Sequence, residues 1–342
     1  MLRIWLIALP VITFWISGTA SALPLAMDAV NAADFQEKAA KAGKAFDPSI
    51  IKAQVLLDRV GFSPGEIDAR PGENMQKAIA AFQAAQRLNA DGKLDREVWT
   101  KLTATSGEPV LIEYTITPED VKGPFLKKLP SKMEDMKNLD RLGYTSPLEG
   151  LAEKFHMSEA LLKTLNPGKS FDKADDTIVV ANIKNPAPQE KVVRVEVDKS
   201  RRVLSAFAKN GDLVAVFPAS IGSEEKPAPS GTHKVTSVSH NPTYRYNPDY
   251  GFRGVKAKHP FTIKPGPNNP VGLVWINLSV KSYGIHGTPE PSKVSKTASH
   301  GCIRLTNWDA LKLASMVEKG TAVTFLEKTE SSQGFAAAAG RH

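Results

Sequence analysis

The sequence has a single cysteine, Cys302, among its 342 residues. A lone cysteine excludes an internal disulfide, so it is a buried structural residue, an intermolecular link or a reactive thiol. Metal ligands are equally scarce. His286, His300 and Cys302 could suggest zinc, but no fourth ligand stands at the usual spacing. The sequence therefore predicts no metal site and no cofactor.

A strong charge imbalance is also lacking. The 44 basic and 36 acidic side chains give a formal net charge of +8, and the excess is spread along the chain. No segment combines basic and aromatic residues as a nucleic-acid-binding surface would, so we expect no nucleic acid as a partner. An anionic polymer such as a cell wall suits the mild positive charge equally well.

Long hydrophobic runs are absent except near the N-terminus. There Arg3 precedes an apolar run from Ile4 to Ile16, and Ala20-Ser21-Ala22 is typical of a signal-peptide cleavage site. The run is short for a spanning helix. We therefore expect a signal peptide over residues 1–22, export to the periplasm or cell envelope, and no stable membrane span after cleavage. Cysteines in oxidising compartments usually come in pairs, which favours a reactive thiol for Cys302.

Helical periodicity begins after a segment, residues 23–45, that we interpret as a linker with some helical tendency. Asp47-Pro48 is typical of a helix start, and the apolar spacing that follows indicates three helices. Two similar turns separate them, Gly65-Glu66-Ile67-Asp68 and Gly92-Lys93-Leu94-Asp95. Residues 46–105 are therefore expected to form a small three-helix domain with a weak internal repeat.

This segment resembles the peptidoglycan-binding domain that is appended to wall-acting enzymes. The resemblance rests on the paired turns, on Ala78, Phe82 and Gln83, and on the closing Trp99 and Leu102. It implies wall binding. The alternative is a three-helix spacer in which Phe82 and Trp99 are core residues.

Residues 110–185 are similar to a LysM-like glycan-binding module. Tyr114-Thr115-Ile116-Thr117-Pro118 is followed, after a long interval, by Leu151 to His156 and by Leu165-Asn166-Pro167. A charged insertion from about Asp120 to Tyr144 departs from the pattern of a compact module. The alternative is that the apolar residues serve only as a helix core.

Beyond the linker at Asn185-Pro186-Ala187-Pro188, the period changes from helical to alternating. One helix interrupts the strands: Thr306 with Asp309 three residues on resembles a capping box at its start, and Gly320 is expected to end it. We expect residues 190–328 to form a mostly-β domain with this one packed helix, and residues 329–342 to be a disordered tail. The whole chain is thus predicted to be an α+β multidomain protein. The strand candidates are Val193 to Val197, Val203 to Phe207, Leu213 to Phe217, His233 to Val238, Leu273 to Leu278, Tyr283 to Gly287 and Thr321 to Leu326.

The cysteine lies beside two histidines, His300 and the more distant His286. A neighbouring imidazolium can lower a thiol pKa to roughly 3.5 to 7.5 and yield a standing thiolate. The Cα atoms of His300 and Cys302 would lie about 6.6 Å apart on extended backbone, which is awkward for a direct hydrogen bond. His286 can return on a neighbouring strand, so we favour it as the base. His300 is then a supporting residue, or alternatively a second base.

Several ordered motifs over residues 192–327 resemble the L,D-transpeptidase (YkuD-type) catalytic domain. By that resemblance Cys302 is the nucleophile, His286 is its base, and the carbonyl of Gly287 orients the imidazole. The resemblance also makes Ser299, His300, Gly301 and Arg304 part of the site. The motifs are Pro229-Ser230-Gly231-Thr232, Pro265 to Gly272, Ile285-His286-Gly287-Thr288 and Ser299-His300-Gly301-Cys302-Ile303-Arg304.

Arg304 follows the cysteine by two residues and is expected to point into the same cleft. Its guanidinium suits a substrate carboxylate, and the alternative is a structural salt bridge.

The resemblance implies an exported enzyme that acts on peptidoglycan stem peptides and glycan. The Cys302 thiolate would attack a tetrapeptide stem, release D-Ala and form an acyl-enzyme. An amine from a neighbouring stem, or from a wall-anchored protein, would then accept the acyl group. With water as acceptor the enzyme would be an L,D-carboxypeptidase or endopeptidase. A papain-like protease is disfavoured because the histidine precedes the nucleophile, and a non-catalytic wall-binding protein would be expected to lose Cys302 or His286.

Overall fold

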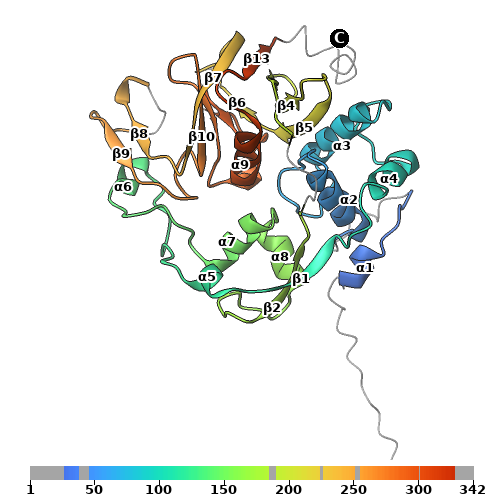
Figure 1. Cartoon of the computed structure of the whole chain (residues 1–342). Coiled ribbons are helices and arrows are strands. Elements are labelled where there is room, and N and C mark those ends of the chain that lie inside the picture. Colours follow the sequence, from blue (N-terminus) through green and yellow to red (C-terminus); the bar gives the residue numbers. More distant parts are fainter. Residues whose placement is uncertain are drawn as a thin grey trace, which may run out of the picture.

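The computed structural model describes residues 27–37, 46–184, 190–223, 226–250, 255–299 and 301–327. The expected signal peptide and C-terminal tail, the Asn185 to Pro188 linker and His300 lie outside the described residues. Figure 1 shows a group of N-terminal helices on one side, a large sheet on the other, and a middle segment that joins them below.

The N-terminal helices are α2 (Pro48–Arg59), α3 (Glu73–Ala85) and α4 (Arg96–Thr103). Asp47 and Asp95 cap α2 and α4 by accepting hydrogen bonds from backbone amides. The internal repeat has a structural counterpart, because Gln54 donates to Asp68 and Gln83 donates to Asp91, both at 2.9 Å.

The segment interpreted as a linker is partly folded. Within it, α1 (Met27–Asn31) places Val30 in the hydrophobic core with no exposed surface. The Asn31 side chain also accepts hydrogen bonds from the backbone amides of Val110 and Leu111. The short apolar stretch was too brief to show a helical period.

The middle segment begins and ends with β1 (Leu111–Thr115) and β2 (Thr177–Ala181), which pair antiparallel. Between them in the sequence lie α5 (Pro118–Val121), α6 (Met133–Met136), α7 (Pro147–Lys154) and α8 (Glu159–Leu165). Helix α6 falls inside the charged insertion, residues 120–144, which we call the arm.

The C-terminal region contains a nine-stranded sheet with the order β5-β4-β3-β13-β7-β10-β11-β12-β6. Helix α9 (Asn307–Met316) packs against it, in contact with β10 and β11. The strands are β3 (Arg194–Asp198), β4 (Val203–Phe207), β5 (Leu213–Pro218), β6 (Ser220–Ile221), β7 (Gly231–His240), β10 (Val274–Leu278), β11 (Gly284–His286), β12 (Ile303–Arg304) and β13 (Ala322–Leu326).

A separate ribbon of β8 (Tyr244–Tyr246) and β9 (Phe261–Ile263) lies beside α6. The sequence had not indicated this ribbon or the short strands β6 and β12. Thr306 caps α9 as expected, but the helix ends at Met316, before Gly320. Val317 has already left the helical conformation, with ψ of 157°, so Gly320 belongs to the following turn.

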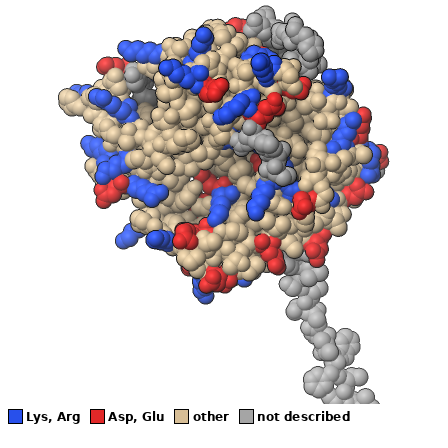
Figure 2. Space-filling model, in the orientation of Figure 1, with Lys and Arg blue, Asp and Glu red and all other residues tan. Residues whose placement is uncertain are grey.

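The parts of the chain pack against one another. One hydrophobic cluster joins residues of the N-terminal helices and the middle segment to Val203, Phe207, Leu213 and Val216 of the sheet. A second cluster lies between the sheet and α9. In the described ranges no helix has the length and apolar character needed to cross a membrane. Figure 2 shows Lys and Arg spread over the visible face with Asp and Glu among them.

Candidate active site

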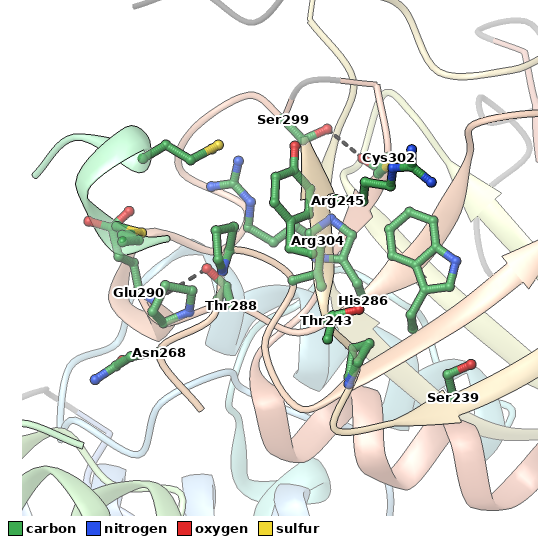
Figure 3. Close-up of a pocket in the computed structure, with 18 of the residues that line it drawn as sticks. Ser239, Thr243, Arg245, Asn268, His286, Thr288, Glu290, Ser299, Cys302 and Arg304 are labelled. Carbon is green, nitrogen blue, oxygen red and sulfur yellow. Dashed lines mark hydrogen bonds between the residues drawn. The ribbon is translucent and has the colours of Figure 1, made fainter. Parts of the chain in front are cut away.

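Two adjacent parallel strands bring the expected site residues together. Ile285 pairs with Ile303, and His286 pairs with Arg304. Both isoleucines are fully buried in the cluster beneath the sheet. Since side chains alternate along a strand, His286, Arg304 and Cys302 face the opposite side, where all three line one cleft (Figure 3).

His286 is held in one orientation. Its side chain is 7% exposed, its ring stacks on Trp275 with centroids 5.6 Å apart, and its Nδ1 lies 2.6 Å from the Gly287 carbonyl. A carbonyl can only accept a hydrogen bond, so Nδ1 carries the proton. The Nε2 atom of the neutral ring is therefore left with a lone pair that can accept a proton.

Cys302 is half-buried at the end of the loop that precedes β12. In the part of the chain that the structure describes, its Sγ hydrogen-bonds the Ser282 carbonyl at 3.8 Å, and no hydrogen bond joins it to His286. The Cys302 carbonyl accepts a hydrogen bond from the Ser299 hydroxyl (Figure 3). Gly301 has φ of +101°, and a Cβ there would lie 3.0 Å from both Lys226 and Tyr283. The turn before the thiol thus requires glycine.

Burial moves the two pKa values in opposite directions. It raises the pKa of the Cys302 thiol, against the opposing effects of the Gly284 amide, Lys226 and Arg304. It lowers the pKa of His286 to about 4, and the Arg304 charge adds to this. Removal from water penalises the charged form of each group. In the free site both groups are therefore neutral at pH 7, which differs from the standing thiolate expected from sequence.

Arg304 is half-buried, and one guanidinium nitrogen donates to the Ala298 carbonyl at 3.4 Å. It forms no ion pair among the described residues, although the charge of the nearby Glu290 carboxylate acts to raise its pKa. Among the described residues that line the cleft, Lys226 and Arg245 are also cationic, and the one carboxylate is that of Glu290, which is paired with Lys293. This described lining is therefore cationic, which suits a ligand that carries carboxylates.

The cleft has a volume of about 630 Å³ and includes residues that the sequence did not indicate. Val274 and Ile276 occupy the buried face of β10, so Trp275 lies on the other face, beside its cross-strand partner His286. That alternation was visible in the sequence. Ser282 also lines the cleft, as do Met133 and Met136 from the arm. No sequence pattern connected the arm with this site.

A buried asparagine lies behind the histidine. Cβ atoms at Gly272 and Gly287 would lie 2.0 and 2.2 Å from the Asn307 side-chain oxygen, so both backbones press against it. Asn307 Nδ2 donates to both carboxylate oxygens of Glu153 at 3.0 Å. The segment that holds His286 is thereby connected to α7 of the middle segment.

Comparison with known proteins identifies two regions of this chain. A family model described as the L,D-transpeptidase catalytic domain matches residues 192–325. A model described as a putative peptidoglycan binding domain matches residues 47–102.

Among relatives, the putative L,D-transpeptidase YkuD of Bacillus licheniformis is 30% identical over 179 residues, which cover 52% of this chain and 92% of that protein. The probable L,D-transpeptidase YbiS of Escherichia coli K12 is 29% identical over 192 residues, or 54% of this chain and 62% of that one. The crystal structure of L,D-transpeptidase 3 from Mycobacterium tuberculosis is 18% identical, with a TM-score of 0.34, and the match covers 45% of this chain and 76% of that one.

Proposed function

Because the chain belongs to the L,D-transpeptidase family, we propose that it is an exported peptidoglycan L,D-transpeptidase with Cys302 as its nucleophile. The observation that carries the proposal is the placement of the Cys302 thiol in one cleft with His286, whose Nδ1 is engaged by the Gly287 carbonyl. This leaves Nε2 as the acceptor for the thiol proton.

The first half-reaction follows from the neutral state of both groups. As Sγ attacks the carbonyl of the third stem residue, the thiol proton moves to His286 Nε2. Backbone amides near Cys302 stabilise the oxyanion. The imidazolium then returns the proton to the D-Ala amine as the peptide bond breaks. The products are free D-Ala and a thioester between the stem and Cys302.

The second half-reaction regenerates the enzyme. An acceptor amine attacks the thioester, loses a proton to His286 and forms a new amide, while the thiolate leaves and is reprotonated. The amine comes from a neighbouring stem, which gives a 3-3 cross-link, or from a wall-anchored protein.

Arg304 and Arg245 in the cleft are suited to the carboxylates of the donor stem. Ser299 and Gly301 support the loop that presents Cys302.

The other two regions would keep the enzyme at the wall. Residues 47–102 match a peptidoglycan-binding family, and we assign them to wall attachment. In the middle segment, α7 and α8 are the longest of the four helices between the paired strands β1 and β2, and we assign the segment a LysM-like role in glycan binding. Wall attachment and a wall substrate together support export and a place in the periplasm or cell envelope.

The test is incubation of the mature protein with a purified disaccharide-tetrapeptide, followed by mass spectrometry. We expect dimers that have lost D-Ala, and none with Cys302→Ala. As a control, both proteins should sediment equally with purified peptidoglycan. Tripeptide without dimer would instead indicate hydrolysis, and an unreacted substrate with the wild-type protein would contradict the proposal.

A further inference from the structure

The base of the arm is bonded to the loop before β10. The Leu142 amide donates to the Pro265 carbonyl at 3.0 Å, and its carbonyl accepts from the Asn268 amide at 2.9 Å. The buried Asn268 side chain also donates to the Gly143 carbonyl at 3.0 Å. Gly266 has φ of +144°, and a Cβ there would lie 2.1 Å from the Leu142 oxygen. The close approach of the two backbones fixes the arm against the sheet domain.

The tip of the arm is held against the β8–β9 ribbon. Glu134 accepts a hydrogen bond from the Lys256 amide at 2.7 Å. The Lys137 ammonium lies 5.8 Å from the centre of the Phe261 ring. Asp140 pairs with Lys264 at 2.9 Å. In Figure 1 α6 accordingly lies beside this ribbon.

This docking leaves two methionines at the cleft. Met133 and Met136 are three residues apart on α6, so they share one side of the helical turn. Both are half-buried and line the cleft that contains Cys302. Neither belongs to either hydrophobic cluster of the described residues. Figure 3 shows the green turn of α6 at the edge of this cleft, across from Cys302.

We propose that the arm forms one wall of the substrate-binding cleft, and that Met133 and Met136 determine specificity by contacting the hydrocarbon part of the donor stem peptide. The inference rests on the proposed function. The cationic groups of the cleft suit the carboxylates of a stem, and the methionines offer apolar surface for the chain between them. Unbranched thioether side chains adapt to such irregular ligands.

Binding can be measured without turnover by placing the changes in the Cys302→Ala protein. Calorimetry with a disaccharide-tetrapeptide should show roughly ten-fold weaker binding for Met133→Ser with Met136→Ser, since two apolar contacts are lost. Met133→Leu with Met136→Leu keeps apolar surface and should bind nearly as the parent does. Asn138→Ser changes an exposed residue of the same arm and should have no effect.

A second readout separates substrate contact from a general loss of structure. In the active enzyme, the serine pair should raise the KM for the donor about ten-fold and leave kcat within two-fold. Alkylation of Cys302 by iodoacetamide, which needs no stem subsite, should be unchanged.

Two results would overturn the inference while leaving the proposed function intact. The serine pair could bind the disaccharide-tetrapeptide as tightly as the parent does, or the leucine pair could lose as much affinity as the serine pair. Absence of any stem binding by the Cys302→Ala parent is a different result. It would remove the proposed function and this inference with it.

Discussion

Cys302 and His286 share a cleft in which neither group is favoured as an ion. Burial raises the pKa of the thiol and lowers that of the imidazole to about 4. A charged pair would have to form inside this site before substrate arrives. Among the described residues, the Gly284 amide, Lys226 and Arg304 favour the thiolate and the Gly287 carbonyl favours the imidazolium, but the effect of burial is larger for both groups. This favours the proposed mechanism, in which the thiolate is generated as the thiol proton moves during attack.

The state of the thiol can be measured by its alkylation rate. Only the thiolate reacts with iodoacetamide. Since the Cys302 pKa is raised, we expect the rate to keep rising with pH beyond the ordinary thiol value of about 8.5, with no plateau near neutrality. Mass spectrometry of samples quenched across the range would give the profile.

The matched variant is His286→Ala. If the two groups are neutral, removal of the imidazole should barely change the pH at which the alkylation rate has its inflection. A plateau below pH 7 in the wild-type protein that disappears in His286→Ala would instead establish the thiolate and imidazolium pair.

At this scale the sequence indicated the chemistry of the site but not its environment. Cys302, His286 and Arg304 could be placed in one cleft because strand alternation carries them to one face. The pKa shifts of Cys302 and His286 depend on burial by the whole fold, which no local pattern reports. Asn307 and Glu153 could not be paired from sequence, because their contact joins distant parts of the chain.

The start of α9 is the element that connects all three parts of the chain. Asn307 bonds Glu153 of the middle segment, and Trp308 stacks on His156 with ring centroids 5.1 Å apart. The Asp309 carboxylate accepts from Ser63 of the N-terminal part at 2.9 Å, rather than completing a capping box. The pKa values of Glu153 and Asp309 are both raised to about 7, chiefly by burial.

Glu153 therefore makes stability depend on pH. Its folded-state pKa of about 7 lies above the ordinary value of 4.5, so its stabilising effect is complete below pH 4.5 and is lost as pH rises through 7. Glu153→Gln stays neutral. At pH 8 we expect its free energy of unfolding, measured by denaturant titration, to exceed that of the wild type by up to about 3 kcal/mol. At pH 5 this difference should disappear.

The control variant for Glu153→Gln should replace a carboxylate that is not buried. Glu159→Gln, on the exposed side of α8, should keep the wild-type dependence on pH. If Glu153→Gln also kept the wild-type dependence on pH, ionisation of Glu153 would not be the cause of the loss of stability at high pH.

Elements with a regular pattern over several residues could be predicted from the sequence, and the shortest elements could not. Helices α2, α3 and α4 have apolar residues at helical spacing, β3 alternates polar and apolar residues, and β10 alternates buried and half-buried ones. Strands β6 and β12 have only two residues each. Such strands form because their neighbours offer hydrogen-bonding edges, which is information outside the segment itself.

At the scale of the whole molecule, the N-terminal helices close an edge of the large sheet. Strand β5 is the last strand on its side, and exposed edges invite pairing with other chains. The segment that follows α2 covers it, because the Ser63 amide donates to the Val216 carbonyl at 2.9 Å and the Val216 amide donates to the Gly61 carbonyl at 3.0 Å. With the shared hydrophobic cluster, this predicts that the helices and the sheet unfold together.

Gly61 is the residue at which this coupling can be tested. It has φ of +94°, and a Cβ there would lie 2.6 Å from the Val214 oxygen, so Gly61→Ala adds backbone strain and pushes the helices from β5. In scanning calorimetry we expect one transition for the wild type, and for Gly61→Ala a loss of about 2 kcal/mol or more with separation into two transitions. Gly107→Ala is the control, because that Cβ would meet nothing within 4 Å. Two transitions in the wild-type protein would mean that the helices and the sheet unfold independently of each other, and a single transition of unchanged midpoint in Gly61→Ala would mean that the contact at Gly61 does not couple them.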